Sequence, residues 1–168
     1  MNDIDKEGTI LTPIIDGDRI YFNGLESLFC IDIEKGEIIW KFDLRNQEDI
    51  ASCKPLIVDN KLYLLPENFN TLYCLDKHTG AKIWENNDAG VGVRKLEFAH
   101  GMVMYAAHHY LMVTNALNGK TIWKKKSPFE NSKANFNGWM PIAINVPDSV
   151  IYISDKQNIM AIKMPELQ

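Results

Sequence analysis

Cysteine is scarce in this sequence, and its spacing argues against several kinds of site. Only Cys30, Cys53 and Cys74 occur among the 168 residues. No two of them have the Cys-x-x-Cys spacing, so a zinc site has little support and we expect no metal. An odd number of cysteines without a secretory leader favours free thiols over a disulfide framework.

Long apolar runs and an excess of positive charge are also missing. No window approaches the ~18 apolar residues of a membrane-spanning helix, so we expect no membrane partner. Residues 1–8 lack the basic and apolar regions of a signal peptide, which predicts a cytoplasmic protein if no leader has been removed. The net charge of −4 argues against nucleic acid, because phosphate binding needs a basic surface.

No segment keeps a helical period for three turns, but a short motif recurs along the chain. Residues 31–40, 75–84 and 114–123 each place Asp or Asn four positions before Gly, and Trp four positions after it. The three tryptophans of this motif are separated by 44 and 39 residues. Such a period of about 40 residues is typical of repeat architectures.

The first half of each unit repeats as well. An apolar run follows Pro13 and Pro55, and a tyrosine-containing strand comes next, at Tyr21, Tyr63, Tyr105 and Tyr152. The β-branched and aromatic content predicts four short strands per unit. We therefore predict one all-β domain over residues 1–168. It is a β-propeller-like array of about four four-stranded blades, at about 9–45, 52–88, 93–127 and 138–165, and the last lacks its own fourth strand.

The residues shared by the units are interpreted as structural. The turn glycines can adopt positive φ, and the Asp or Asn of the motif can accept backbone N–H bonds across the turn. The tryptophans can fill the gap between adjacent sheets from the outermost strand. Cys30 and Cys74 share one repeat position, which favours buried, small apolar side chains. The predicted structural residues are Trp40, Trp84, Trp123, Gly36, Gly80, Gly119, Asp32 and Asp76.

The repeat resembles that of the pyrroloquinoline-quinone-type (PQQ-like) propeller family, most clearly over residues 72–84, Leu-Tyr-Cys-Leu-Asp-Lys-His-Thr-Gly-Ala-Lys-Ile-Trp. The resemblance implies a propeller fold, and it covers quinone dehydrogenases as well as outer-membrane assembly scaffolds and other interaction proteins. Family propellers usually have seven or eight blades. The chain is therefore a four-bladed miniature, an open arc, or half of a ring that self-association would complete.

The resemblance also implies what a quinone enzyme would need. It would stack the quinone on a Trp, hold calcium with carboxylate and amide oxygens, and use a catalytic Asp and a disulfide between adjacent cysteines. No adjacent cysteines occur here, so we expect no cofactor, no catalytic residues and no enzyme. The alternative is a ligand-binding or quinone-dependent enzyme fragment that uses the loop face as a pocket, which an apolar pocket with converging polar groups would favour.

The function that we predict is a non-catalytic protein-binding module. In a propeller, the loops between blades and those between second and third strands emerge on one face, here called the loop face. Large aromatic and Arg residues on irregular loops are typical of binding hot spots. The predicted contacts are Arg45, Phe69, Arg94, His109, Tyr110, Phe136 and Trp139. Size and acidic charge suit the cytoplasmic immunity (neutralising) partner of a secreted bacterial toxin, whose binding domain would be basic.

Overall fold

A computed structural model describes residues 13–24, 27–44, 54–66, 70–90, 95–107, 110–126, 142–154 and 159–166, and these residues form fifteen strands and no helix. The strands make four antiparallel sheets, each of which follows the chain order of its strands. The predicted all-β, propeller-like array of about four blades is thus confirmed. No helix long and apolar enough to cross a membrane occurs in these ranges.

Blades 1 and 2 each contain four strands in the order of the sequence. Blade 1 consists of β1 (Ile14–Asp16), β2 (Arg19–Asn23), β3 (Ser27–Asp32) and β4 (Ile38–Asp43). Blade 2 consists of β5 (Leu56–Val58), β6 (Lys61–Leu64), β7 (Leu72–Asp76) and β8 (Lys82–Asn86). The motif tryptophans Trp40 and Trp84 therefore lie on the edge strand of each sheet.

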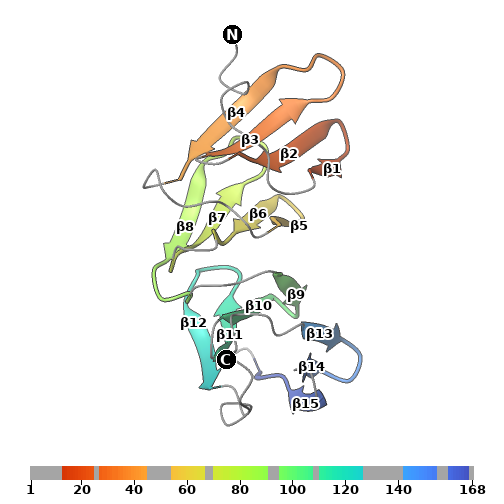
Figure 1. Cartoon of the computed structure of the whole chain (residues 1–168), viewed down its shortest axis with the longest axis vertical. Coiled ribbons are helices and arrows are strands. Elements are labelled where there is room, and N and C mark those ends of the chain that lie inside the picture. The colour runs from red at the N-terminus through yellow and green to blue at the C-terminus, as the bar shows by residue number, and fades with distance from the viewer. Residues whose placement is uncertain are drawn as a thin grey trace.

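Blade 3 repeats this arrangement, and blade 4 has three described strands. Blade 3 consists of β9 (Glu97–Ala99), β10 (Met102–Ala107), β11 (Tyr110–Asn115) and β12 (Thr121–Lys126). Blade 4 consists of β13 (Ile142–Asn145), β14 (Val150–Ser154) and β15 (Ile159–Lys163). Figure 1 shows the four sheets following one another, with blades 1 and 4 at opposite ends of the row.

The turn between the third and fourth strands is built by the repeated Asp and Gly. In blade 2, Asp76 Oδ1 accepts hydrogen bonds from the backbone N–H groups of His78 (3.0 Å) and Thr79 (2.9 Å). The Thr79 hydroxyl donates to the same oxygen and lowers the pKa of Asp76 below its ordinary value. Gly80 ends the turn at φ +71°, a backbone conformation that favours glycine. The turn chemistry predicted from the repeat is confirmed at these residues.

The hydrophobic core lies between adjacent blades, in three successive clusters. Each cluster combines side chains from two neighbouring sheets, because both faces of a blade carry apolar residues. Tyr21 and Leu62 meet between blades 1 and 2, Tyr63 and Val103 between blades 2 and 3. The stability of the fold therefore depends on each blade having a neighbour.

One carbonyl in blade 2 and one in blade 3 each receive two side chains of the preceding blade. Trp40 Nε1 and the Tyr21 hydroxyl both donate to the carbonyl of Lys77, each over 3.1 Å. In the same way, Trp84 Nε1 (3.3 Å) and the Tyr63 hydroxyl (3.2 Å) donate to the carbonyl of Ala116. Lys77 and Ala116 both directly follow the Asp or Asn of the turn. These hydrogen bonds fix the register of one blade against the next.

Blade 3 departs from the repeat by one residue. Tyr21 and Tyr63 pair across the sheet with Cys30 and Cys74, whereas Tyr105 pairs with Met112 and is thus one position further along its strand. A shift of one residue turns a side chain to the other face of a sheet. The spacing of 42 residues that made Tyr105 equivalent to Tyr63 was therefore misleading, and Met104 holds the equivalent position.

Candidate functional site

Most of the predicted loop-face contacts lie outside the described residues. These are Arg45, Phe69, Arg94, His109, Phe136 and Trp139, and Cys53 lies outside them too. Tyr110 is described, and it begins strand β11 instead of lying in a loop. It is half-buried and has Lys124 Nζ 5.0 Å from the centre of its ring. The placement of Tyr110 in a loop was wrong, because Tyr110 already pairs with Ala107 of β10 as the first residue of β11.

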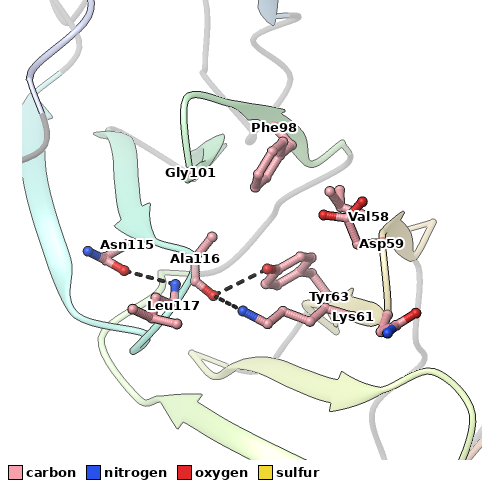
Figure 2. A pocket seen from close by; sticks show the side chains of 10 residues that line it. Val58, Asp59, Lys61, Tyr63, Phe98, Gly101, Asn115, Ala116 and Leu117 are labelled. Atoms are coloured by element: carbon pink, nitrogen blue, oxygen red, sulfur yellow. Dashed lines mark hydrogen bonds between the residues drawn. The ribbon is translucent and has the colours of Figure 1, made fainter.

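A groove opens on the opposite face, which we call the turn face because it carries the turns of the first and third hairpins of each blade. The groove has a volume of about 370 Å³ and lies between blades 2 and 3 (Figure 2). Blade 2 and blade 3 both supply its walls, and the lining residues are Val58, Asp59, Asn60, Lys61, Tyr63, Phe98, Gly101, Asn115, Ala116 and Leu117.

The groove exists because blade 3 carries a short side chain where blade 2 carries a long one. At the junction of blades 1 and 2, Lys77 Nζ reaches Asp16 Oδ2 (2.7 Å) and covers this position. At the junction of blades 2 and 3 the equivalent residues are Ala116 and Val58, which cannot form such a pair. The space that Lys77 fills in one junction is therefore left open in the next.

Two polar side chains in the groove, those of Lys61 and Tyr63, hold the two blades together. Lys61 Nζ (3.4 Å) and the Tyr63 hydroxyl (3.2 Å) both donate to the carbonyl of Ala116, as Figure 2 shows. Burial raises the pKa of Tyr63, so its hydroxyl keeps its proton and acts as a donor at neutral pH. Asn115 Oδ1 accepts a hydrogen bond from the N–H of Leu117 (2.8 Å). None of these groups is arranged as a nucleophile with its base.

One apolar residue of the groove is strongly exposed. Leu117 stands at its rim with 74% of its surface accessible, and Val58 and Phe98 are half-buried beside it. An exposed leucine above an apolar recess is the kind of surface that receives an apolar side chain of a partner. Asp59 is the one carboxylate in the lining, so the groove lacks the several carboxylates that a calcium site commonly uses.

A second groove of about 510 Å³ lies on the same face, between blades 3 and 4. Its lining is more polar and comprises His100, Met102, Asp148, Ser149, Lys163, Met164, Pro165 and Glu166. His100 Nε2 lies 3.2 Å from the carbonyl of Val146, which joins the two blades at the rim. Successive blade junctions thus present recesses of different chemistry along one face.

The thiols of Cys30 and Cys74 and the phenol of Tyr21 are buried structural groups. Cys30 and Cys74 carry free thiols with no exposed surface. Burial raises the pKa of the Cys74 thiol to about 11 and also raises that of Cys30, so both stay protonated at neutral pH. Burial likewise raises the pKa of Tyr21 to about 12. Among the described residues, no three His, Cys, Asp or Glu side chains gather as a metal site would require.

The sequence prediction missed the groove on the turn face. One signal was present: Ala116 and Leu117 stand where the second unit has Lys77 and His78, a change from charged and polar to apolar residues in an exposed turn. The turn itself was assigned correctly from its Asn and Gly. The groove could not be predicted from one repeat unit, because it depends on how the side chain of Ala116 meets the preceding blade.

The repeated sheets and their shared carbonyl contacts define an array of β-propeller blades. A family model described as PQQ_2, outer membrane protein assembly factor BamB, matches residues 3–166. The chain therefore belongs to this family, which confirms the resemblance seen in the repeat. A comparison with curated protein sequences gives no significant match.

Solved structures share the fold at low sequence identity. The computationally designed Ika4 protein is 13% identical with a TM-score of 0.66, over 91% of this chain and 89% of that protein. The quinohemoprotein alcohol dehydrogenase ADHIIG from Pseudomonas putida HK5 is 18% identical with a TM-score of 0.64, over 88% and 28%. BamB from Moraxella catarrhalis is 15% identical with a TM-score of 0.51, over 95% and 65%. The chain thus spans under two thirds of the two natural proteins, and the likeness concerns the fold alone.

Proposed function

We propose that this chain is a non-catalytic protein-binding module that receives an apolar side chain of its partner in the groove between blades 2 and 3. The exposed Leu117 above the half-buried Val58 and Phe98 carries the proposal. The description of the family as an assembly factor supports a role exerted through contacts with other proteins. The buried thiols and the structurally engaged hydroxyl of Tyr63 support a surface without catalytic groups.

The experiment tests whether the partner binds in the groove. The chain is used to capture partners from its native host, and the captured protein is identified by mass spectrometry and purified for affinity measurement. Leu117→Asp places a charge in the groove and is expected to weaken binding at least tenfold, because an apolar contact is replaced by a desolvated carboxylate. Ile83→Asp is the matched control, since Ile83 is also exposed but lies on the edge strand β8 away from the groove.

The competing form of the proposal places the partner on the loop face, with Arg45, Phe69, Arg94, His109, Tyr110, Phe136 and Trp139 as contacts. Tyr110→Ala and Arg94→Ala test it, after their melting temperatures have been checked. If these two changes abolish binding while Leu117→Asp leaves it within a factor of two, the partner docks on the loop face and the groove is not the site.

A finer form of the proposal concerns the identity of the partner. The net charge of −4 favours a basic partner, such as a secreted bacterial toxin that this chain neutralises in the cytoplasm. Attraction between opposite charges would make association faster at low salt. Co-expression with the captured protein tests the neutralising role: host growth should recover with the wild-type chain and should not recover with the variant that no longer binds.

The enzymatic alternative is tested with the quinone itself. The two described grooves do not fit a quinone–calcium site, because neither is lined by a tryptophan and the groove between blades 2 and 3 has a single carboxylate. Titration of the chain with pyrroloquinoline quinone and calcium is therefore expected to leave the absorption spectrum of the quinone unchanged. A saturable spectral change would favour the ligand-binding alternative over the protein-binding module.

A further inference from the structure

Blades 1 and 4 each have one face that points away from the rest of the row, here called the outer face or end face of that blade. The outer face of blade 4 has the residue pattern of a blade-to-blade interface, but no blade covers it in the described structure. Tyr152 pairs across its sheet with Ala161, in the register that joins Tyr21 to Cys30 and Tyr63 to Cys74. Tyr21 and Tyr63 are 0% and 1% exposed because the next blade covers them, whereas Tyr152 is 40% exposed. The same position is thus buried inside the array and open at its end.

The neighbouring position on β15 shows the same contrast more strongly. Ile159 stands two residues before Ala161, as Leu28 stands before Cys30 and Leu72 before Cys74. Leu28 and Leu72 have no exposed surface, and Ile159 has 79%. Two large apolar side chains at interface positions are therefore uncovered on the same face of blade 4. Hydrophobic residues scattered singly over a surface are common, but two at interface positions on one face indicate a binding surface.

The complementary surface is exposed at the other end of the same chain. Ile15 of blade 1 holds the position that Ile57 holds in blade 2, one residue before the end of the first strand. Ile57 packs in the cluster between blades 1 and 2, whereas Ile15 is 69% exposed. Ile33, in the turn that follows β3, is also exposed. It holds the same position as Lys77 of blade 2, because the backbone N–H of each residue donates to a carbonyl in the first hairpin turn of its own blade.

These two surfaces cannot meet within one molecule, because blades 1 and 4 lie at opposite ends of the row (Figure 1). We propose that two copies of this chain pack the outer face of blade 4 against the outer face of blade 1 of the other copy, twice, and so close a ring of eight blades. A head-to-tail contact forms a ring when its rotation closes, and propellers of up to eight blades are typical. The proposal does not depend on the partner-binding role of the groove.

The contacts inside the chain specify the chemistry of this interface. The hydroxyl of Tyr152 donates to the carbonyl of Ile33 in the second copy, as Tyr21 donates to Lys77 and Tyr63 to Ala116. Ile159 and Ala161 cover the sheet that carries Ile15. The junction of blades 1 and 2 contains the ion pair of Asp16 and Lys77, but the equivalent residues here are Asn145 and Ile33, so the interface has no such pair. Association is therefore expected to persist at high salt.

The first measurement is the mass of the full chain in solution by light scattering coupled to size exclusion, over a range of concentrations and at low and high salt. The proposal predicts a particle of twice the 19.2 kDa of one chain at both salt concentrations. A folded monomer at every concentration overturns the proposal, and so does a particle larger than a dimer, because the contact would then extend without closing.

The second measurement uses the head-to-tail geometry. Ile15→Glu and Ile159→Lys alter exposed side chains, so each variant alone should stay folded but be monomeric. When the two variants are mixed, one of the two contacts joins unaltered faces and the other brings Glu and Lys together, so the dimer should return. Ile83→Lys, at an exposed position outside both end faces, should remain dimeric.

Recovery in the mixture distinguishes the proposal from simple damage to the fold, because two misfolded chains would not restore each other. Failure of the mixture to form a dimer while both variants stay folded overturns the head-to-tail arrangement. Loss of the dimer in Ile83→Lys overturns the assignment of the interface to the two end faces.

Discussion

The indole ring of Trp40 lies directly against Gly80 of the neighbouring blade. A Cβ atom added to Gly80 would come within 2.7 Å of Cδ2 and Cε3 of Trp40, and Gly80 also has a φ of +71°. Trp84 and Gly119 repeat this relationship in the next junction, at 2.5 Å from Cε3. Glycine is therefore required at these turns for two separate reasons, the backbone conformation and the close approach of the ring.

Alanine substitutions at the turn glycines separate these two reasons. Gly36 has a φ of +66°, but within the described part of the chain nothing beyond its sequence neighbours lies within 4 Å of an added Cβ. Gly36→Ala should therefore lower the free energy of unfolding by about 1 kcal/mol from backbone strain alone. Gly80→Ala adds a clash with the indole, and we expect a loss of about 3 kcal/mol. Urea unfolding of the two variants measures the difference. Equal losses would contradict the packing of Trp40 on Gly80.

The carbonyl of Ala116 allows a test of cooperation between blades. Tyr63→Phe should cost about 1 kcal/mol, because Trp84 Nε1 still donates to the carbonyl after the hydroxyl is removed. Trp84→Phe leaves the Tyr63 hydroxyl in place in the same way. The double variant leaves only the longer bond from Lys61, so its loss of stability should exceed the sum of the single losses. Additive losses would mean that the two donors act independently.

The buried thiols give a prediction that depends on pH. The pKa of Cys74 is raised from the ordinary value of 9.0 to about 11, so its contribution to stability is fully present below pH 9 and is lost as the pH rises through 11.

In a Cys53→Ala background, Cys30 and Cys74 should not react with Ellman's reagent at pH 8 until the chain is unfolded. Rapid reaction of either thiol in the folded protein would contradict its burial between blades.

Filling the groove tests its role without disturbing the rest of the face. Ala116→Lys together with Val58→Asp reproduces the pair of Lys77 and Asp16 at the equivalent positions of the preceding junction. We expect the melting temperature to stay close to that of the wild type, because such a pair already fits between two blades. Partner binding, measured by calorimetry, should be lost. Unchanged affinity would show that the partner does not enter the groove.

The sequence predicted the turns and the edge strands well, because their residues are chosen by local backbone chemistry. Asp76 and Gly80 recur at a fixed spacing since one caps the turn and the other supplies its positive φ. Tyr105 was misplaced because its equivalence rested on spacing along the chain, and one residue fewer between hairpins moved it to the other face of its sheet. The groove beside Ala116 depends on two blades at once, so no single unit reveals it.

The order in which the blades pack against one another underlies all of these predictions, and nuclear magnetic resonance can test it directly. The α protons of Gly80 and Gly119 should be shifted upfield by the rings of Trp40 and Trp84 and should show nuclear Overhauser effects to them, because each ring lies on a glycine of the next blade. Gly36 should show neither effect, because no side chain lies near it among the described residues. Unshifted signals for Gly80 and Gly119, with no contact to an indole, would contradict the arrangement of the blades.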